Sequence, residues 1–153
     1  MRFMDDAKEI EINGKFFRVG VVSRRIWKEL QIKSAGILRA FPGFMEFISK
    51  SKEEVEGADS GEIGKRITQN MSSEELLKAD LALYDVHREM VKFGVRGHRG
   101  LLDKEGREIV FEKDELGHVK DELIDLYDLN GFFTRLATEV QAFNNLTEDA
   151  KKN

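Results

Sequence analysis

The sequence predicts a mainly helical α+β protein with two short β-hairpins, in which helices pack around a central helix at about residues 73–93. Residues 73–93 repeat apolar side chains at the spacing of one helix face. Two other stretches, 9–19 and 101–111, each place a glycine turn between segments suited to strands. Together these patterns favour a fold that combines helices with two short hairpins.

The central helix has matching start, periodicity and stop signals. Ser72 can cap its N-terminus, and Glu75 three residues later completes a capping box. Gly94 can adopt the left-handed conformation that ends a helix. The apolar positions of its stripe are Leu76, Ala79, Leu83, Val86, Met90 and Phe93. A stripe of this length must be covered, so we expect the flanking segments to fold around it.

Length and composition limit the class of protein. The 153 residues fit a single domain over 1–153. The chain has no cysteine, which excludes disulfides and thiolate metal sites. No signal peptide and no run of about 18 apolar residues is present, so we expect a cytoplasmic protein that does not cross a membrane.

Charge is uneven along the chain. Residues 1–50 hold ten Lys/Arg against six Asp/Glu, residues 51–102 eight against ten, and residues 103–153 seven against thirteen. A basic front and an acidic back permit head-to-tail contact between copies and hence a homo-oligomer. The alternative is a solvated surface with chance asymmetry.

The first 48 residues predict a hairpin followed by helices. Asn13-Gly14 is the dipeptide best suited to a type I′ turn within 9–19. Ser23 can cap a helix that carries Ile26, Trp27 and Leu30. In the apolar stretch 34–48 that follows, a helix ends near Ala40, and Pro42 suits the first turn of another. The apolar cluster that follows, which contains Phe44 and Phe47, is either core or an exposed partner surface.

Two segments are rich in glycine. Residues 49–70 are polar with scattered glycines, which predicts a mobile loop. Residues 94–100, Gly-Val-Arg-Gly-His-Arg-Gly, contain Arg96 and Arg99 and could approach a phosphate. Their spacing matches neither nucleotide-binding glycine motif, and the acidic chain argues against nucleic acid as a partner. The alternative is a connector that turns the chain.

The C-terminal third predicts a hairpin and two helices. Within 101–111, Asp103 can bond forward to the backbone while Gly106 takes a positive φ. A helix is expected over about 119–128, stopping at Asn130-Gly131, and a second begins at Phe132 and Phe133 and ends near Phe143. The polar residues 144–153 predict a frayed tail.

No catalytic, metal or cofactor site can be assigned from the sequence. The three histidines, His87, His98 and His118, lie on different predicted elements without the paired spacing of a zinc helix. No nucleophile, base and orienting group can be nominated together. We therefore expect a protein that is not an enzyme and needs no cofactor.

Three stretches carry a family resemblance. They are Ile-Asn-Gly-Lys-Phe-Phe-Arg-Val at 12–19, the glycine turn and acidic hairpin at 94–111, and the Asn-Leu, acidic, Lys-Asn ending at 143–153. In these stretches the chain resembles the tail assembly chaperones of long-tailed bacteriophages. The resemblance covers about half of the chain and includes no catalytic motif.

This resemblance implies a non-enzymatic phage or prophage protein that binds the tape-measure protein while tail tube subunits are recruited. It also implies a host-cytoplasmic protein absent from the mature virion. On this hypothesis an apolar helix face covers the client, with Phe132, Phe133 and Phe44 or Phe47 as anchors; Arg96 and Arg99 are further partner-binding candidates. The alternatives are a ring-forming virion subunit and a small nucleic-acid binder that uses the two arginines.

Overall fold

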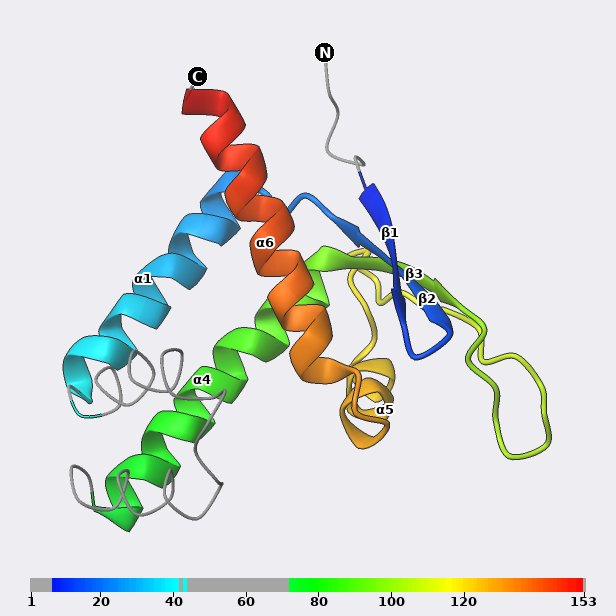
Figure 1. Cartoon of the computed structure of the whole chain (residues 1–153), viewed down its shortest axis with the longest axis horizontal. Coiled ribbons are helices and arrows are strands. Elements are labelled where there is room, and N and C mark those ends of the chain that lie inside the picture. The colour runs from blue at the N-terminus through cyan, green and yellow to red at the C-terminus, as the bar shows by residue number, and fades with distance from the viewer. Residues whose placement is uncertain (1–6, 42, 44–71, 153) are drawn as a thin grey trace, which may run out of the picture. The chain divides into compact units, whose positions relative to one another are not determined.

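A computed structural model of the chain describes residues 7–41, 43 and 72–152. In these residues it contains four helices and a three-stranded antiparallel sheet, which confirms the α+β class (Figure 1). The elements are β1 (Ala7–Ile12), β2 (Lys15–Gly20), α1 (Arg24–Ala40), α4 (Ser73–Gly94), β3 (Val95–Arg99), α5 (Asp121–Leu129) and α6 (Phe133–Lys152). No helix of the described residues has the length and apolar character to cross a membrane.

The chain divides into two compact units. The first comprises Met1–Lys28 and His87–Asn153, and the second comprises Glu29–Val86. The single domain expected over 1–153, and the packing of helices around the central one, both stay predictions. The loop expected at 49–70 lies outside the described residues.

The first unit contains the sheet, in the order β1, β2, β3. The predicted N-terminal hairpin is confirmed: β1 pairs with β2, and Asn13 and Gly14 between them have φ angles of 51° and 77°. The expectation of a connector at 94–100 is wrong, because Val95–Arg99 forms strand β3, which pairs with β2. The hairpin therefore gains a third strand from residues about eighty positions away in the chain.

One face of this sheet forms the core of the first unit. Phe17 and Val19 of β2 are fully buried, and α6 packs against this strand. Their neighbours in the core include Leu136 and Val140 of α6 and Ile124 and Tyr127 of α5. The apolar side of the hairpin thus docks on a helix, as the instability of a lone hairpin in water requires.

Gly94 ends α4 in a different way from the one predicted. Its φ is not positive, and the chain passes directly into β3. A Cβ built on Gly94 would lie 2.4 and 2.7 Å from the two γ-methyl groups of Val140. Gly94 is therefore needed for the close approach of α6, and the sharp change from helix to strand occurs without a left-handed residue.

The helix starts follow the sequence closely. The backbone N–H of Glu75 donates to Ser72 Oγ at 3.1 Å, and that of Ile26 donates to Ser23 Oγ at 3.4 Å. In the second unit, Ala79 is fully buried and packs against Phe41, Leu76 and Leu83. The predicted stripe of α4 is therefore its inner face there.

Asn144 of α6 binds the end of β2 and the segment between β2 and α1. Its Oδ1 accepts the backbone N–H of Val22 at 2.8 Å, and its Nδ2 donates to the carbonyl of Gly20 at 3.2 Å and of Val140 at 2.8 Å. The side chain is buried. A frayed tail was expected from residue 144, but α6 continues to Lys152, and Asn144 is a buried anchor of this helix.

Two turns of the same construction follow β3. In each, an aspartate Oδ1 accepts the backbone N–H groups two and four residues later, and the glycine three residues later has a positive φ. The first runs from Asp103 to Arg107 and the second from Asp114 to His118. The predicted roles of Asp103 and Gly106 are confirmed, but 101–111 forms a single bridge, Leu102 with Glu108, in place of a full hairpin.

Candidate partner-binding site

Arg96 joins two backbone segments of the first unit through hydrogen bonds. Its guanidinium donates to the carbonyl oxygen of Phe93, and to that of Val21 at 2.6 Å. The side chain also covers Gly20, where an added Cβ would lie 2.8 Å from Arg96 Cγ. Burial lowers the pKa of Arg96. With its donors directed to the end of α4 and the end of β2, Arg96 has a structural role in place of the anion-binding role considered above.

Arg99 is tied across the outer face of the sheet. Its Nε donates to Glu9 Oε1 at 2.8 Å, and its guanidinium carbon lies 3.9 Å from the centroid of the Phe16 ring. This hydrogen bond raises the pKa of Arg99 and lowers that of Glu9. Arg99 thus links β3 to β1 over the central strand, and its charge is matched by a carboxylate of its own chain.

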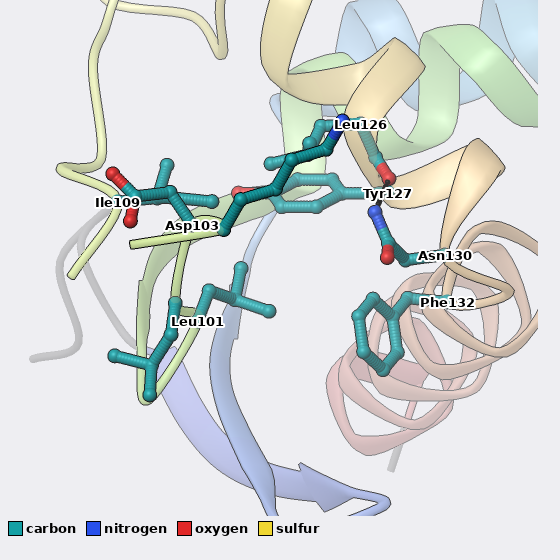
Figure 2. Close-up of a pocket in the computed structure, with 9 residues that line it drawn as sticks. Leu101, Asp103, Ile109, Leu126, Tyr127, Asn130 and Phe132 are labelled. Atoms are coloured by element: carbon teal, nitrogen blue, oxygen red, sulfur yellow. Dashed lines mark hydrogen bonds between the residues drawn. The ribbon is translucent and has the colours of Figure 1, made fainter. Parts of the chain in front are cut away.

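A pocket of about 290 Å³ lies between the turn after β3 and the end of α5, all within the first unit (Figure 2). Most of its lining is apolar, and Asp103, Lys104 and Asn130 add polar groups. The apolar lining comes from Leu101, Leu102, Ile109, Leu126, Tyr127 and Phe132. Figure 2 shows Leu101 and Ile109 on one side and Leu126, Tyr127 and Phe132 on the other.

His98 joins the two sides of this pocket. Its Nε2 lies 2.6 Å from the carbonyl oxygen of Ile109, and its Nδ1 lies 2.6 Å from Tyr127 Oη. A carbonyl can only accept, so Nε2 carries a proton, and in the neutral ring Nδ1 accepts from the tyrosine hydroxyl. The imidazole also packs edge-on against Phe17 and Phe111. His98 therefore links Ile109 and Tyr127, which line opposite sides of the pocket.

Tyr127 contributes to the pocket with its ring and not with an ionised oxygen. The residue is fully buried, and this burial raises the pKa of its hydroxyl far above the usual value. Asn130 is held at the C-terminus of α5, where its Nδ2 donates to the carbonyl of Leu126 at 2.8 Å. Burial thus holds Tyr127 in place, and the bond to Leu126 positions Asn130 in the pocket lining.

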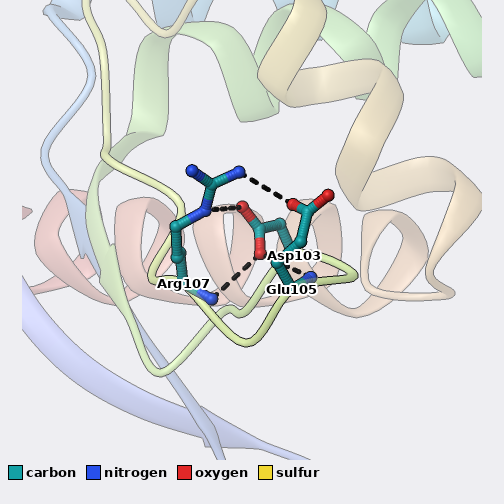
Figure 3. Close-up of polar contacts among 3 residues, drawn as sticks. All are labelled: Asp103, Glu105 and Arg107. Carbon is teal, nitrogen blue, oxygen red and sulfur yellow. Dashed lines mark hydrogen bonds and ion pairs between the residues drawn. The ribbon is translucent and has the colours of Figure 1, made fainter.

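The outer rim of the pocket is the first aspartate turn (Figure 3). Arg107 contacts Glu105 at 2.8 Å and Asp103 at 3.4 Å through its guanidinium nitrogens. Asp103 in turn accepts the backbone N–H groups of Glu105 and Arg107, each at 2.9 Å. The bonds of Asp103 define the turn, and the exposed ion pairs of Arg107 add little to its stability. The rim is therefore ordered but highly charged.

The predicted phenylalanine anchors are not at the surface in the described residues. Phe132 and Phe133 are only 6% and 5% exposed, because Phe132 directly precedes α6 and Phe133 begins it where the helix packs into the core. The ring centroid of Phe132 lies 5.3 Å from that of Phe17, and Phe132 also lines the pocket. The two residues are core residues and not exposed anchors. Phe44 and Phe47 lie outside the described residues.

The remaining histidines form no site with other ligands. The described residues contain no group of three or more His, Asp, Glu or Cys side chains placed to hold a metal ion. His87 is half-buried on α4, and burial lowers its pKa. His118 packs edge-on against Phe93 with ring centroids 4.6 Å apart. Packing accounts for His87, whereas the buried Nδ1 of His118 has no hydrogen-bond partner among the described residues.

The lining of the pocket includes one well-exposed leucine, and a second exposed leucine lies on α5. Leu102 lines it and is 56% exposed, and Leu129, one turn after Leu126 on α5, is 86% exposed. Sequence reasoning assigned Leu126 to a helix and overlooked these two leucines. A signal was present, since Leu129 breaks the apolar period of its helix just before Asn130-Gly131.

Comparison with known proteins identifies no relative of this chain. No protein-family model, no curated protein and no solved structure matches the chain.

Proposed function

We propose that this chain is a non-enzymatic tail assembly chaperone of a long-tailed phage or prophage, which binds the tape-measure protein and helps to recruit tail tube subunits. The proposal places it in the host cytoplasm and outside the mature virion. Its support from the sequence is the resemblance in 12–19, 94–111 and 143–153.

The observation that carries a protein-binding role is the apolar pocket, whose lining includes the exposed Leu102. Pockets that enclose small-molecule ligands measure about 300–1,000 Å³, so this one is at or below their lower limit. Its size suits a protruding side chain of a partner, and protein interfaces derive most of their energy from a few such anchors. The exposed leucine at this pocket adds apolar area that a helical client can cover.

Co-expression with the tape-measure protein encoded by the same phage tests this role. The wild-type chain is expected to keep that protein soluble and to remain bound to it during affinity purification. Leu102→Ser should weaken this binding roughly tenfold, since it removes an exposed apolar contact without disturbing the core. Leu116→Ser is the matched control, because Leu116 is also exposed, lies on the second aspartate turn and does not line the pocket.

Mass spectrometry of lysate and purified particles separates the chaperone from its rival. A chaperone is expected to be abundant in lysate from infected or induced cells and absent from particles of the same culture. A fixed copy number in the particles would overturn the chaperone role and favour a virion subunit. Loss of tape-measure binding in both leucine variants, or in neither, would remove the pocket from the proposal.

A further inference from the structure

The polar side chains of the pocket lining differ in what they can still bind. Asp103 Oδ1 accepts two backbone N–H groups of its own turn, and its Oδ2 lies 3.4 Å from Arg107 Nε. The Tyr127 hydroxyl lies 2.6 Å from His98 Nδ1, to which it donates when the ring is neutral. Asp103 and Tyr127 are therefore engaged within the fold, and the open polar groups of the pocket come from the other two polar residues of its lining.

Asn130 offers a hydrogen-bond acceptor of fixed orientation. Its Nδ2 donates to the carbonyl oxygen of Leu126 at 2.8 Å, and because a carbonyl can only accept, the amide cannot be turned the other way. Its oxygen consequently points away from Leu126 (Figure 2). Among the described residues, no donor is hydrogen-bonded to this Oδ1. A ligand in the pocket thus meets one open acceptor, which an N–H group of the ligand satisfies.

Lys104 offers a cation. Its side chain lines the pocket, is exposed, and forms no ion pair within the part of the chain that the structure describes. An ammonium group beside an apolar surface attracts the face of an aromatic ring, and the attraction is strongest for tryptophan. The same charge repels lysine and arginine side chains of a partner. The cation therefore favours an aromatic occupant over a basic one.

The walls of the pocket suit a flat ring system. Leu101 and Ile109 lie on one side, and Leu126, Tyr127 and Phe132 lie on the other (Figure 2). The volume of about 290 Å³ holds one large side chain and falls just below the range of drug-sized sites. Aromatic side chains bury more apolar area than other side chains do, and they pack favourably against aromatic walls. The shape of the pocket and its cation therefore favour the same class of occupant.

We infer that the pocket binds a tryptophan side chain of the client. This inference rests on the proposed role of the pocket as a protein-binding site, and it adds the chemical identity of the anchor. The indole N–H donates to Asn130 Oδ1, the ring face lies against the ammonium group of Lys104, and the ring fills the apolar space. Indole is a donor only, so it matches the single open acceptor. A tyrosine hydroxyl also accepts and needs a donor of its own, and a leucine side chain satisfies neither open group.

Two probe molecules of the same shape test the inference on the full chain. The first is N-acetyl-tryptophanamide, and the second is its benzothienyl analogue, in which sulfur replaces the indole N–H. In NMR titrations of the isotope-labelled protein, the tryptophan probe should shift the backbone signals of Leu101, Ile109 and Asn130. The analogue should bind roughly fivefold to tenfold more weakly, because it cannot donate to Asn130 Oδ1.

Variants of the two open polar groups assign the roles. Asn130→Ala should bind the two probes equally, whereas Asn130→Asp keeps an acceptor oxygen and should still prefer the tryptophan probe. The second variant also loses the bond to Leu126, so it separates the acceptor from the structural role of the amide. Lys104→Met should weaken binding of both probes by roughly threefold, and Lys104→Arg should restore it. Lys113→Met is the matched control, since Lys113 is exposed and does not line the pocket.

Contrary outcomes are defined by the same titrations. Equal binding of the two probes by the wild type, or the absence of any binding, would overturn the inference. So would tighter binding of N-acetyl-leucinamide than of the tryptophan probe, or signal shifts confined to residues away from the pocket. The titrations contain no tape-measure protein, so their failure leaves the chaperone role to be judged by co-expression. Conversely, failure of co-expression with intact discrimination between the probes would overturn the chaperone role alone.

Discussion

His98 Nδ1 lies 2.6 Å from Tyr127 Oη, and the opposite nitrogen of the same ring lies 2.6 Å from the carbonyl of Ile109. One imidazole thus joins β3 to α5 and to the turn that forms the other wall of the pocket. Because both bonds are partly buried and connect opposite sides of the pocket, their loss should change the pocket and the stability of the first unit together.

We predict that His98→Phe lowers the free energy of unfolding by about 2 kcal/mol. The new ring can keep the packing against Phe17 and Phe111, but Ile109 O and the Tyr127 hydroxyl lose their partner. Tyr127→Phe, which removes only the hydroxyl, should lose about 1 kcal/mol. Urea denaturation measures both. The double variant should lose less stability than the sum of the two single losses, because both substitutions remove the same hydrogen bond. A loss equal to that sum would show that the two groups do not interact.

Asn144→Ala should destabilise the protein by about 2–3 kcal/mol. The substitution leaves the buried N–H of Val22 and the carbonyl of Gly20 without the amide that they share. Asn145→Ala is the control, because Asn145 is exposed on the next position of α6 and should change stability by less than about 0.5 kcal/mol. Equal effects of the two substitutions in thermal or urea unfolding would contradict the anchoring role.

Gly94→Ala should destabilise by about 1–3 kcal/mol, since its methyl group would overlap the side chain of Val140. Val140→Ala creates the missing space, so the double variant should be more stable than the sum of the two changes predicts. Gly36→Ala in α1 provides the opposite control. Nothing lies within 4 Å of its added Cβ, and stability should rise by up to about 1 kcal/mol. Circular dichroism during thermal unfolding checks all four proteins.

His87 should make stability depend on pH in mildly acidic solution. Burial lowers its pKa in the folded state, so the unfolded chain binds a proton more readily. Stability from this residue is therefore complete above the unfolded pKa of about 6.5 and falls as the pH decreases below it. His87→Gln should show a weaker decrease between about pH 7.5 and 5. Parallel curves for wild type and variant, measured by urea denaturation at several pH values, would contradict this cause.

Local signals predicted the elements whose partners lie close in sequence. The Asn13-Gly14 turn, the Ser72 cap and the Asp103 to Gly106 turn are set by a few neighbouring residues, and the structure confirms them. Val95–Arg99 was misassigned because its strand partner is β2, far earlier in the chain. A glycine at its centre weakens the strand signal, so only the pairing register shows that these residues form a strand.

The candidate site was less predictable than the fold for the same reason. Phe132 and Phe133 have the composition of interface anchors, and only their burial in the first unit shows that they are core. Arg96 looked like an anion ligand until its two carbonyl partners were known. The pocket depends on His98 contacts across 11 and 29 residues, a distance that no local pattern encodes.

The contact of the Asn144 amide with Val22 also bears on when the chain can fold during its synthesis. Its partner Val22 is 122 residues earlier in the chain, and the third strand of the sheet follows β2 by about eighty residues. Contacts over such separations form late and slow folding, because a long loop must close before they are gained. A ribosome must therefore release nearly all of these residues before the N-terminal hairpin is covered. Until then the hairpin offers its apolar face to any chaperone at the exit tunnel.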